Sequence, residues 1–225
     1  MIRLALFDID GTLIRTGGAG VRAFERTGAA EFHRPNGVSH IKFAGRTDVS
    51  LVREFFAAHD IPATDENFNR FFDRYAFLLE DQMRHAQGGP CAGVEAFLRG
   101  LRTLPEPPLL GLLTGNIRLG AEIKLRRFEM WALFETGAFG DDHEDRNELA
   151  RIARARGSSV LGRELDGSEV LVVGDTGFDI ACGRAIQARV MAVGTGGGKL
   201  EELRKHQPDW LVRDLREASP AEVCL

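Results

Sequence analysis

The sequence predicts an α/β fold, with a parallel sheet covered by helices on both faces and a helical unit inserted near the amino terminus. Short runs of Leu, Val and Ile that are apolar throughout alternate with helical patterns, as in a parallel sheet buried on both sides. All but the first of these runs lie beyond about residue 108, and residues 17–88 offer no convincing strand. A chain of 225 residues is long enough for a core domain with such an insert.

Five or six strands and five covering helices are expected in the core. The strands are expected at residues 4–9, 109–113, 170–173 and 190–193, with weaker candidates at 137–139 and 210–212. The helices are expected at residues 93–104, 119–128, 146–156, 179–187 and 199–205. The alternation of the two sets predicts that each strand is joined to a parallel neighbour through a helix.

The insert repeats apolar residues at helical spacing. Helices are expected over residues 20–32 and 48–59, and a third helix is expected after Thr64. Thr64 is followed by two acidic residues, and this combination is typical of the start of a helix. The apolar stripe of this third helix consists of Phe68, Phe71, Phe72, Tyr75, Leu78, Leu79 and Met83. Gly88, Gly89 and Pro90 indicate a linker. We therefore expect a catalytic core of residues 1–16 and 89–225 and a helical cap of residues 17–88.

Composition and charge exclude several classes of partner. The 29 basic and 33 acidic side chains leave a net charge of -4, and no basic run with interleaved aromatics predicts nucleic-acid binding. No apolar segment approaches the length of a membrane span, and the amino terminus lacks the pattern of a signal peptide, so a cytoplasmic protein is expected. The three cysteines have no metal-ligand spacing and predict neither a zinc site nor a disulfide framework.

Two aspartates, Asp8 and Asp10, lie at the end of the first apolar run. In open parallel sheets, ligands bind beyond the carboxyl ends of the strands, and both residues lie at such an end. Two residues apart in extended chain, their side chains project to the same side and repel each other unless a cation lies between them or one is protonated. The pair therefore implies a metal ion, acid/base chemistry, or both.

Two further strand ends carry polar groups. The strand before Asp175 ends in glycine, and Asp179 follows about one helical turn later. Such carboxylates suit a hard ion like Mg2+, which keeps waters and substrate phosphate as its other ligands. The strand over 109–113 leads into Thr114 and Gly115, whose hydroxyl and amide are donors suited to a phosphoryl oxygen.

In this order, DIDGT (residues 8–12), LLTGN (112–116) and GDTGFD (174–179) resemble three of the four motifs of the haloacid dehalogenase superfamily. The resemblance covers nearly the whole chain and is to the branch of phosphoglycolate phosphatases and β-phosphoglucomutases. It implies a three-layer α/β sandwich with a parallel Rossmann-like sheet. It also implies that the helical insert forms a cap over the site.

The resemblance implies roles for the motif residues. Asp8 would be the nucleophile that takes the phosphoryl group, and Asp10 the general acid and base. Mg2+ would be held by Asp8, the backbone carbonyl of Asp10 and Asp175, with Asp179 in support. The residues implied at the substrate are Thr114, Gly115 and Asn116, with Gly11 and Thr12 shaping the turn behind the nucleophile.

The remaining motif is a lysine or arginine whose charge offsets that of the phosphoryl group and the nucleophile. Relatives commonly place it just before the helix that follows the third strand, which favours Arg146. Lys124 is the alternative, although its neighbours Arg126 and Arg127 are typical of a solvated helix face. In the insert, Arg46 of the loop GRTD (45–48) would suit an anionic or hydroxylated part of the substrate, with simple surface charge as the alternative.

These features predict a Mg2+-dependent phosphatase that hydrolyses a small phosphomonoester through an aspartyl phosphate. The nearest alternative is a phosphomutase of the same superfamily, and the alternative of a different class is a non-catalytic phosphoacceptor or ligand-sensing module. The expected partner is a small phosphorylated metabolite. Phosphoglycolate is suggested by the family alone, and the sequence carries no signal for the oligomeric state.

Overall fold

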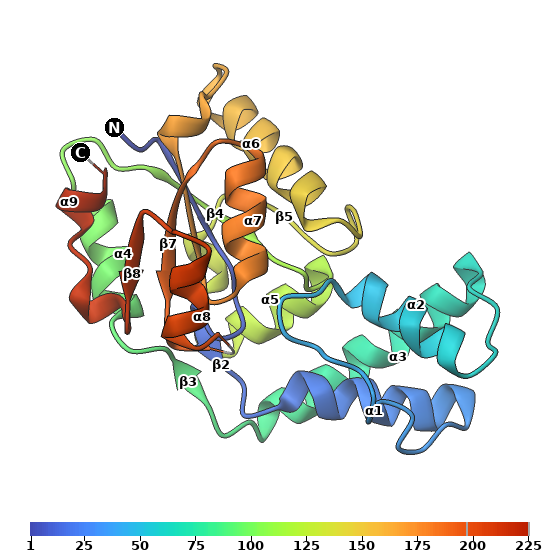
Figure 1. Cartoon of the computed structure of the whole chain (residues 1–225). Coiled ribbons are helices and arrows are strands. Elements are labelled where there is room, and N and C mark those ends of the chain that lie inside the picture. Colours follow the sequence, from blue (N-terminus) through green and yellow to red (C-terminus); the bar gives the residue numbers. More distant parts are fainter. Residues whose placement is uncertain (197, 225) are drawn as a thin grey trace.

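The computed structural model describes residues 1–196 and 198–224, so Gly197 and Leu225 of the predicted core domain lie outside it. Within the described part, six strands form one parallel sheet in the order β5-β4-β1-β6-β7-β8 (Figure 1). The strands are β1 Leu4–Phe7, β4 Leu109–Leu113, β5 Thr136–Ala138, β6 Val170–Gly174, β7 Arg189–Val193 and β8 Trp210–Val212. The predicted α/β class with a parallel sheet is confirmed.

The central strand β1 sets the place of the site. Phe7 at its end pairs with Leu112 of β4 on one side and with Val173 of β6 on the other. The three strands are parallel, so their carboxyl ends meet at one edge of the sheet. The residues that follow β1, β4 and β6 are therefore brought together, although they are far apart in the sequence.

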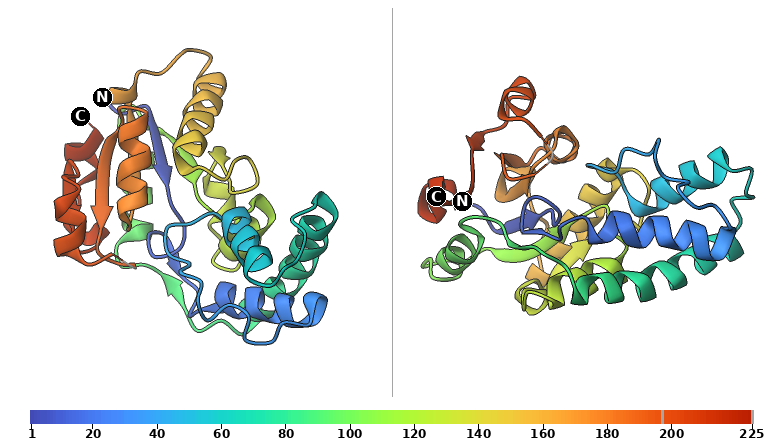
Figure 2. Two further views of the ribbon diagram at one scale, coloured as in Figure 1. Left: turned by 45° about the vertical axis from the view of Figure 1, so that its right-hand side comes forward. Right: turned by 90° about the horizontal axis from the view of Figure 1, so that it is seen from below.

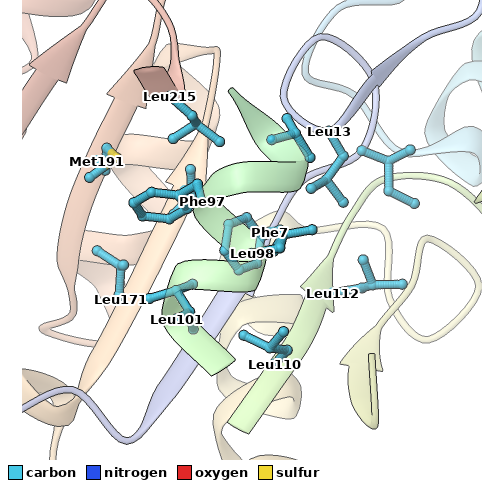
Figure 3. Close-up of a cluster of buried hydrophobic side chains, with 14 of the residues drawn as sticks. Phe7, Leu13, Phe97, Leu98, Leu101, Leu110, Leu112, Leu171, Met191 and Leu215 are labelled. Atoms are coloured by element: carbon cyan, nitrogen blue, oxygen red, sulfur yellow. The ribbon is translucent and has the colours of Figure 1, made fainter. Parts of the chain in front are cut away.

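Helices cover both faces of the sheet and make it a three-layer sandwich (Figure 2). One face carries α4 (Val94–Arg102), α5 (Arg118–Arg126) and α9 (Pro220–Cys224), and the other carries α6 (Arg146–Leu161), α7 (Gly177–Ala185) and α8 (Leu200–Lys205). Side chains alternate along β1, so Ala5 and Phe7 enter the first layer and Leu4 and Leu6 the second. In Figure 3, Phe97, Leu98 and Leu101 of α4 lie in the same buried cluster as Phe7.

Helix α6 runs five residues beyond its predicted end at residue 156. The predicted helix stops just before Gly157, because glycine is a poor helix former. In the structure, a Cβ at Gly157 would lie 2.5 Å from Leu4 Cδ2, so glycine lets the helix pack closely on β1. The helix ends at Gly162, which takes a left-handed conformation with φ 66°. Tertiary packing thus outweighs the local preference here.

The insert consists of helices α1 (Ala19–Phe32), α2 (Asp48–Ala58) and α3 (Asp65–Arg84), which lie beside the sheet (Figure 1). They share a buried cluster in which the rings of Phe24 and Phe71 lie 4.7 Å apart. The predicted stripe of α3 faces this cluster, with Phe68 and Phe72 only partly buried at its margin. An aromatic stripe here is helix-packing core, as expected.

The chain enters and leaves the insert at one place. Strand β2 (Ile14–Arg15) pairs antiparallel with β3 (Gly89–Pro90), and neither of these short strands was expected from the sequence. A Cβ at Gly88 would lie 1.9 Å from the carbonyl oxygen of Arg15, so the two crossings touch through backbone atoms. Ladders of two residues leave no alternating pattern to detect, which is why the segment read as a simple linker.

The longest helix, α3, has 20 residues and a charged exposed face. Neither α3 nor any other helix of the described chain combines the length and the hydropathy that a membrane span requires.

Candidate active site

A cavity of about 430 Å³ lies between the carboxyl edge of the sheet and the helical insert. The predicted site residues that line it are Asp8, Asp10, Gly11, Arg46, Thr114, Gly115, Asn116, Arg146 and Asp175. Thr12 and Asp179 lie behind this surface and are each 1% exposed. The structure therefore brings every predicted residue to one place, and two of them lie behind the cavity surface.

Three buried carboxylates, those of Asp8, Asp175 and Asp179, form an acidic cluster, each offering an oxygen within 4.8 Å of the other two. Burial raises the pKa of Asp8 well above its ordinary value, the negative charge of Asp179 raises it further, and Arg146 opposes both. Oxygen donors at this spacing and with excess negative charge fit a divalent cation. The chemistry of the donor set thus agrees with the predicted metal site.

The turn after β1 supports the acidic cluster from behind. Gly11 has φ 88°, and a Cβ there would lie 2.8 Å from Asp175 Oδ2 and 2.7 Å from the Cα of Gly196. Thr12 donates its hydroxyl hydrogen to Asp175 Oδ1 at 3.3 Å. In this structure, Thr12 orients a carboxylate of the cluster rather than facing the cavity.

The loop after β4 presents Thr114 and Gly115 to the cavity. Oγ1 of Thr114 accepts hydrogen bonds from the backbone amide and the Nδ2 of Asn116, at 3.3 and 2.8 Å, which leaves the hydroxyl hydrogen to donate to a ligand. Gly115 is packed under the loop of the insert, since a Cβ there would lie 2.1 Å from the carbonyl oxygen of Arg46. Only glycine lets the two loops approach this closely.

Two buried cations reach the site, and each contacts a different carboxylate. Arg146, at the start of α6, forms an ion pair with Asp179, and its Nη2 lies 3.6 Å from Asp8 Oδ1. Burial opposes its charge, but Asp179 and Asp8 outweigh that effect and raise the pKa of Arg146. Lys124 of α5 donates to Asp10 at 2.6 Å. The expectation that Lys124 belongs to a solvated helix face is wrong.

Lys124 could have been found from its place on the helix. Its side chain is 5% exposed and belongs to the buried face of α5, which also carries Gly120, Ala121 and Leu125. A lysine at the spacing of the apolar face of a helix needs a buried partner of opposite charge. The neighbouring Arg126, in contrast, is 68% exposed and pairs with Glu122.

Arg46 lines the cavity but has partners within the insert. Its guanidinium forms an ion pair with Glu54 and donates to the carbonyl oxygen of Ser50 at 3.3 Å. Part of its charge is therefore compensated before any substrate binds. Its role in reading the substrate stays a prediction.

Asp48 is the first residue of α2, and the N-cap of this helix is Thr47. Asp48 is 8% exposed and joins the insert to the core, because its Oδ2 accepts from the backbone amide of Ile117 at 2.9 Å and its own amide donates to Gly115 at 2.7 Å. Burial raises the pKa of Asp48 to about 6, against the positive charge of Lys124 and the hydrogen bond from Ile117. An ionised Asp48 is thus buried at this junction without an ion pair to any described residue.

Replacing Asp48 with asparagine is expected to make stability less dependent on pH. A carboxyl whose pKa is raised from 3.8 to about 6 in the folded state contributes stability at low pH, and this is lost as the pH rises through 6. Asparagine keeps an acceptor for Ile117 but does not ionise. As the pH is raised from 4 to 7.5, the free energy of unfolding of the Asp48→Asn variant should rise relative to that of wild type by on the order of 3 kcal/mol. Urea denaturation at each pH measures this difference.

The control for this measurement is Asp73→Asn, which removes an exposed carboxylate of α3 and should leave the pH dependence unchanged. If the difference in free energy of unfolding between Asp48→Asn and wild type stayed constant over this pH range, Asp48 would ionise in the folded protein without loss of stability.

A parallel Rossmann-like sheet whose carboxyl edge carries an acidic cluster, a hydroxyl donor and two buried cations under inserted helices defines a class of hydrolytic enzymes. The family model described as haloacid dehalogenase-like hydrolase matches residues 5–193. This chain therefore belongs to that family, as the motifs predicted, and it is a hydrolase.

Among known proteins, the pyrophosphatase PpaX of Bacillus pumilus (strain SAFR-032) is 25% identical over 224 residues, covering 96% of this chain and 94% of the relative. The crystal structure of CbbY from Rhodobacter sphaeroides in complex with phosphate matches 96% of each chain with a TM-score of 0.73 and 17% identity. A structure described as a predicted phosphoglycolate phosphatase from Haemophilus somnus 129PT matches 95% of each chain, also with a TM-score of 0.73 and 17% identity. These two structural similarities establish a shared fold.

Proposed function

We propose that this protein is a Mg2+-dependent phosphatase that hydrolyses a small phosphomonoester through an aspartyl phosphate. The observation that carries the proposal is the convergence of Asp8, Asp10 and Thr114 in one cavity with the acidic cluster and Arg146. The similarity to a relative named as a pyrophosphatase supports phosphoryl chemistry.

The acidic cluster would hold the metal ion. We propose Asp8, the backbone carbonyl of Asp10 and Asp175 as its ligands, with Asp179 acting through water or by orienting its neighbours. When bound, Mg2+ would offset the repulsion between the cluster and the phosphoryl group and stabilise the charge of the transition state. Arg146, which Asp179 holds beside Asp8, would add the fixed positive charge of a side chain next to the nucleophile.

The reaction would proceed in two displacements at phosphorus. The Asp8 carboxylate attacks, the bond to the leaving oxygen breaks, and Asp10 gives that oxygen its proton. Water then attacks the phosphorus of the aspartyl phosphate and gives a proton to Asp10. The bond between phosphorus and the Asp8 oxygen breaks, so that phosphate is released and the Asp8 carboxylate is restored. The Thr114 hydroxyl and the Gly115 amide would donate to phosphoryl oxygens in both steps.

The helical insert, residues 17–88, would be the cap over a core of residues 1–16 and 89–225. Closure would exclude bulk water from the reacting groups, and the β2–β3 crossing is where the chain passes between the two parts. Val21, Phe24 and Phe43 of the insert line the cavity and would face the non-phosphate part of the substrate, together with Arg46.

Phosphate release tests the proposal directly. With p-nitrophenyl phosphate, release should require Mg2+, stop on chelation and return when Mg2+ is restored. A panel of phosphoglycolate, sugar phosphates and pyrophosphate, scored by kcat/KM, would then identify the substrate class. Conversion of one sugar phosphate isomer to another would favour the mutase, and no release from any of these compounds would contradict the proposal.

A further inference from the structure

The buried amine of Lys124 belongs to a closed hydrogen-bonded ring with Asp10 and Asn116. Lys124 Nζ donates to Asp10 Oδ2 and to Asn116 Oδ1, each at 2.6 Å, and Asn116 Nδ2 donates to the same Asp10 Oδ2 at 2.9 Å. Such a lysine is tolerated in the interior only when its charge is paired and its hydrogens are bonded. The ring provides both.

The ring admits one orientation of the Asn116 amide. Its oxygen faces the ammonium group, and its nitrogen faces the carboxylate of Asp10 and the hydroxyl of Thr114. The opposite orientation would set oxygen against oxygen and N–H against ammonium. Asn116 therefore couples the loop after β4 to the aspartate after β1, and its amide is engaged within the protein.

Both hydrogen bonds to the Asp10 carboxylate end on the same oxygen. Oδ2 accepts from Lys124 and from Asn116, whereas no described residue hydrogen bonds to Oδ1. The Asp10 side chain is 42% exposed and lines the cavity. Because two strong donors already occupy Oδ2, Oδ1 is the carboxylate oxygen that is left to interact with a ligand.

We propose that Lys124 and Asn116 are positioning residues that hold Oδ2 of Asp10 and so leave Oδ1 as the oxygen that exchanges protons with the substrate. This proposal rests on the proposed phosphatase function. As the P–O bond to the leaving group breaks, the Oδ1 proton passes to the leaving oxygen. When water attacks the aspartyl phosphate, one of its protons returns to Oδ1. Lys124 acts through Asp10 in both steps and does not touch the phosphoryl group.

This role differs from that of a cation that offsets phosphoryl charge, and the geometry separates the two. Arg146 lies at Asp8 and Asp179, on the side of the nucleophile. Lys124 lies at Asp10 and Asn116, on the side of the acid and base. Loss of a phosphoryl cation slows every substrate alike, whereas loss of a residue that orients the acid slows poor leaving groups most.

The test is Lys124→Met, which keeps the length of the side chain and removes its charge. Rapid-mixing kinetics with p-nitrophenyl phosphate should retain the burst of nitrophenolate, because this leaving group departs without a proton. Steady-state turnover should fall, since hydrolysis of the aspartyl phosphate still needs Asp10. For alkyl phosphates, kcat/KM should fall by on the order of 10²- to 10³-fold.

Two comparisons make the result specific. Asp10→Asn should show the same dependence on the leaving group, and the double variant Lys124→Met/Asp10→Asn should be no slower than Asp10→Asn alone, because the two residues act as one unit. Arg126→Met, which removes an exposed charge from the same helix, should behave as wild type. Asn116→Ala tests the same prediction with a smaller expected effect if Lys124→Met does not fold.

An equal loss of the burst and of alkyl phosphate turnover in Lys124→Met, additive with Asp10→Asn, would overturn the inference and leave the phosphatase intact. The absence of any Mg2+-dependent phosphate release from wild type would instead contradict the proposed function itself.

Discussion

Asp8→Asn should lose phosphatase activity by on the order of 10⁴-fold or more, because no other described carboxylate could replace it as nucleophile without changing the geometry of the site. Asparagine has nearly the same shape, so binding of substrate should change far less than kcat. Acid quenching during turnover should trap a phosphorylated wild-type protein and none in the variant. A variant that kept more than about one part in a hundred of the activity would place the nucleophile elsewhere.

A second readout of Asp8→Asn does not depend on activity. In the presence of a chelator, the variant should unfold at a temperature equal to or above that of wild type, since one of three crowded carboxylates has lost its charge. The stabilisation gained on adding Mg2+ should shrink, because one ligand is missing. Asp73→Asn, on the exposed face of α3, should match wild type in both measurements.

Arg146→Met is expected to lower kcat/KM by on the order of 10²- to 10³-fold for aryl and alkyl phosphates alike. The reason is the position of Arg146 beside Asp8 and Asp179, where it would act on the phosphoryl group and the nucleophile and not on the leaving group. Full turnover in this variant, together with an equal loss on all substrates in Lys124→Met, would assign the phosphoryl cation to Lys124 instead.

The same substitution should destabilise the protein when no metal is bound. Asp179 is 1% exposed and would lose its buried cation, which typically costs on the order of 3–5 kcal/mol. Urea denaturation in chelator measures this loss, and Mg2+ should restore part of it. Arg146→Lys, which keeps a positive charge, should be less destabilised, and Arg151→Met, at a half-exposed position of α6, should be close to wild type.

The sheet and the insert follow from local patterns. The strand at 109–113 is observed as predicted, and the aromatic stripe of α3 faces its neighbours, because a fully buried strand or an amphipathic helix must carry its apolar residues at a fixed spacing. The extension of α6 past Gly157 and the β2–β3 ladder depend on contacts with other segments, and no local spacing records them.

The meeting of the candidate site residues can also be predicted from these patterns, once the geometry of a parallel sheet is added. Asp8, Thr114 and Asp175 each come directly after a parallel strand, and the carboxyl ends of such strands share an edge. Their meeting in one cavity could therefore be expected from the order of strands and motifs, before any coordinates.

The partners of the charged side chains, in contrast, were decided by the tertiary structure. Lys124 lies 114 residues from Asp10 in sequence, and Ile117 lies 69 residues from Asp48, yet each pair is hydrogen bonded. Arg46 turned out to pair with Glu54 within its own segment. A spacing pattern shows which face of a helix is buried, but it does not show which carboxylate pairs with a charged side chain on that face. The reason is that an ion pair needs only two atoms in contact and places no constraint on the residues between them in the sequence.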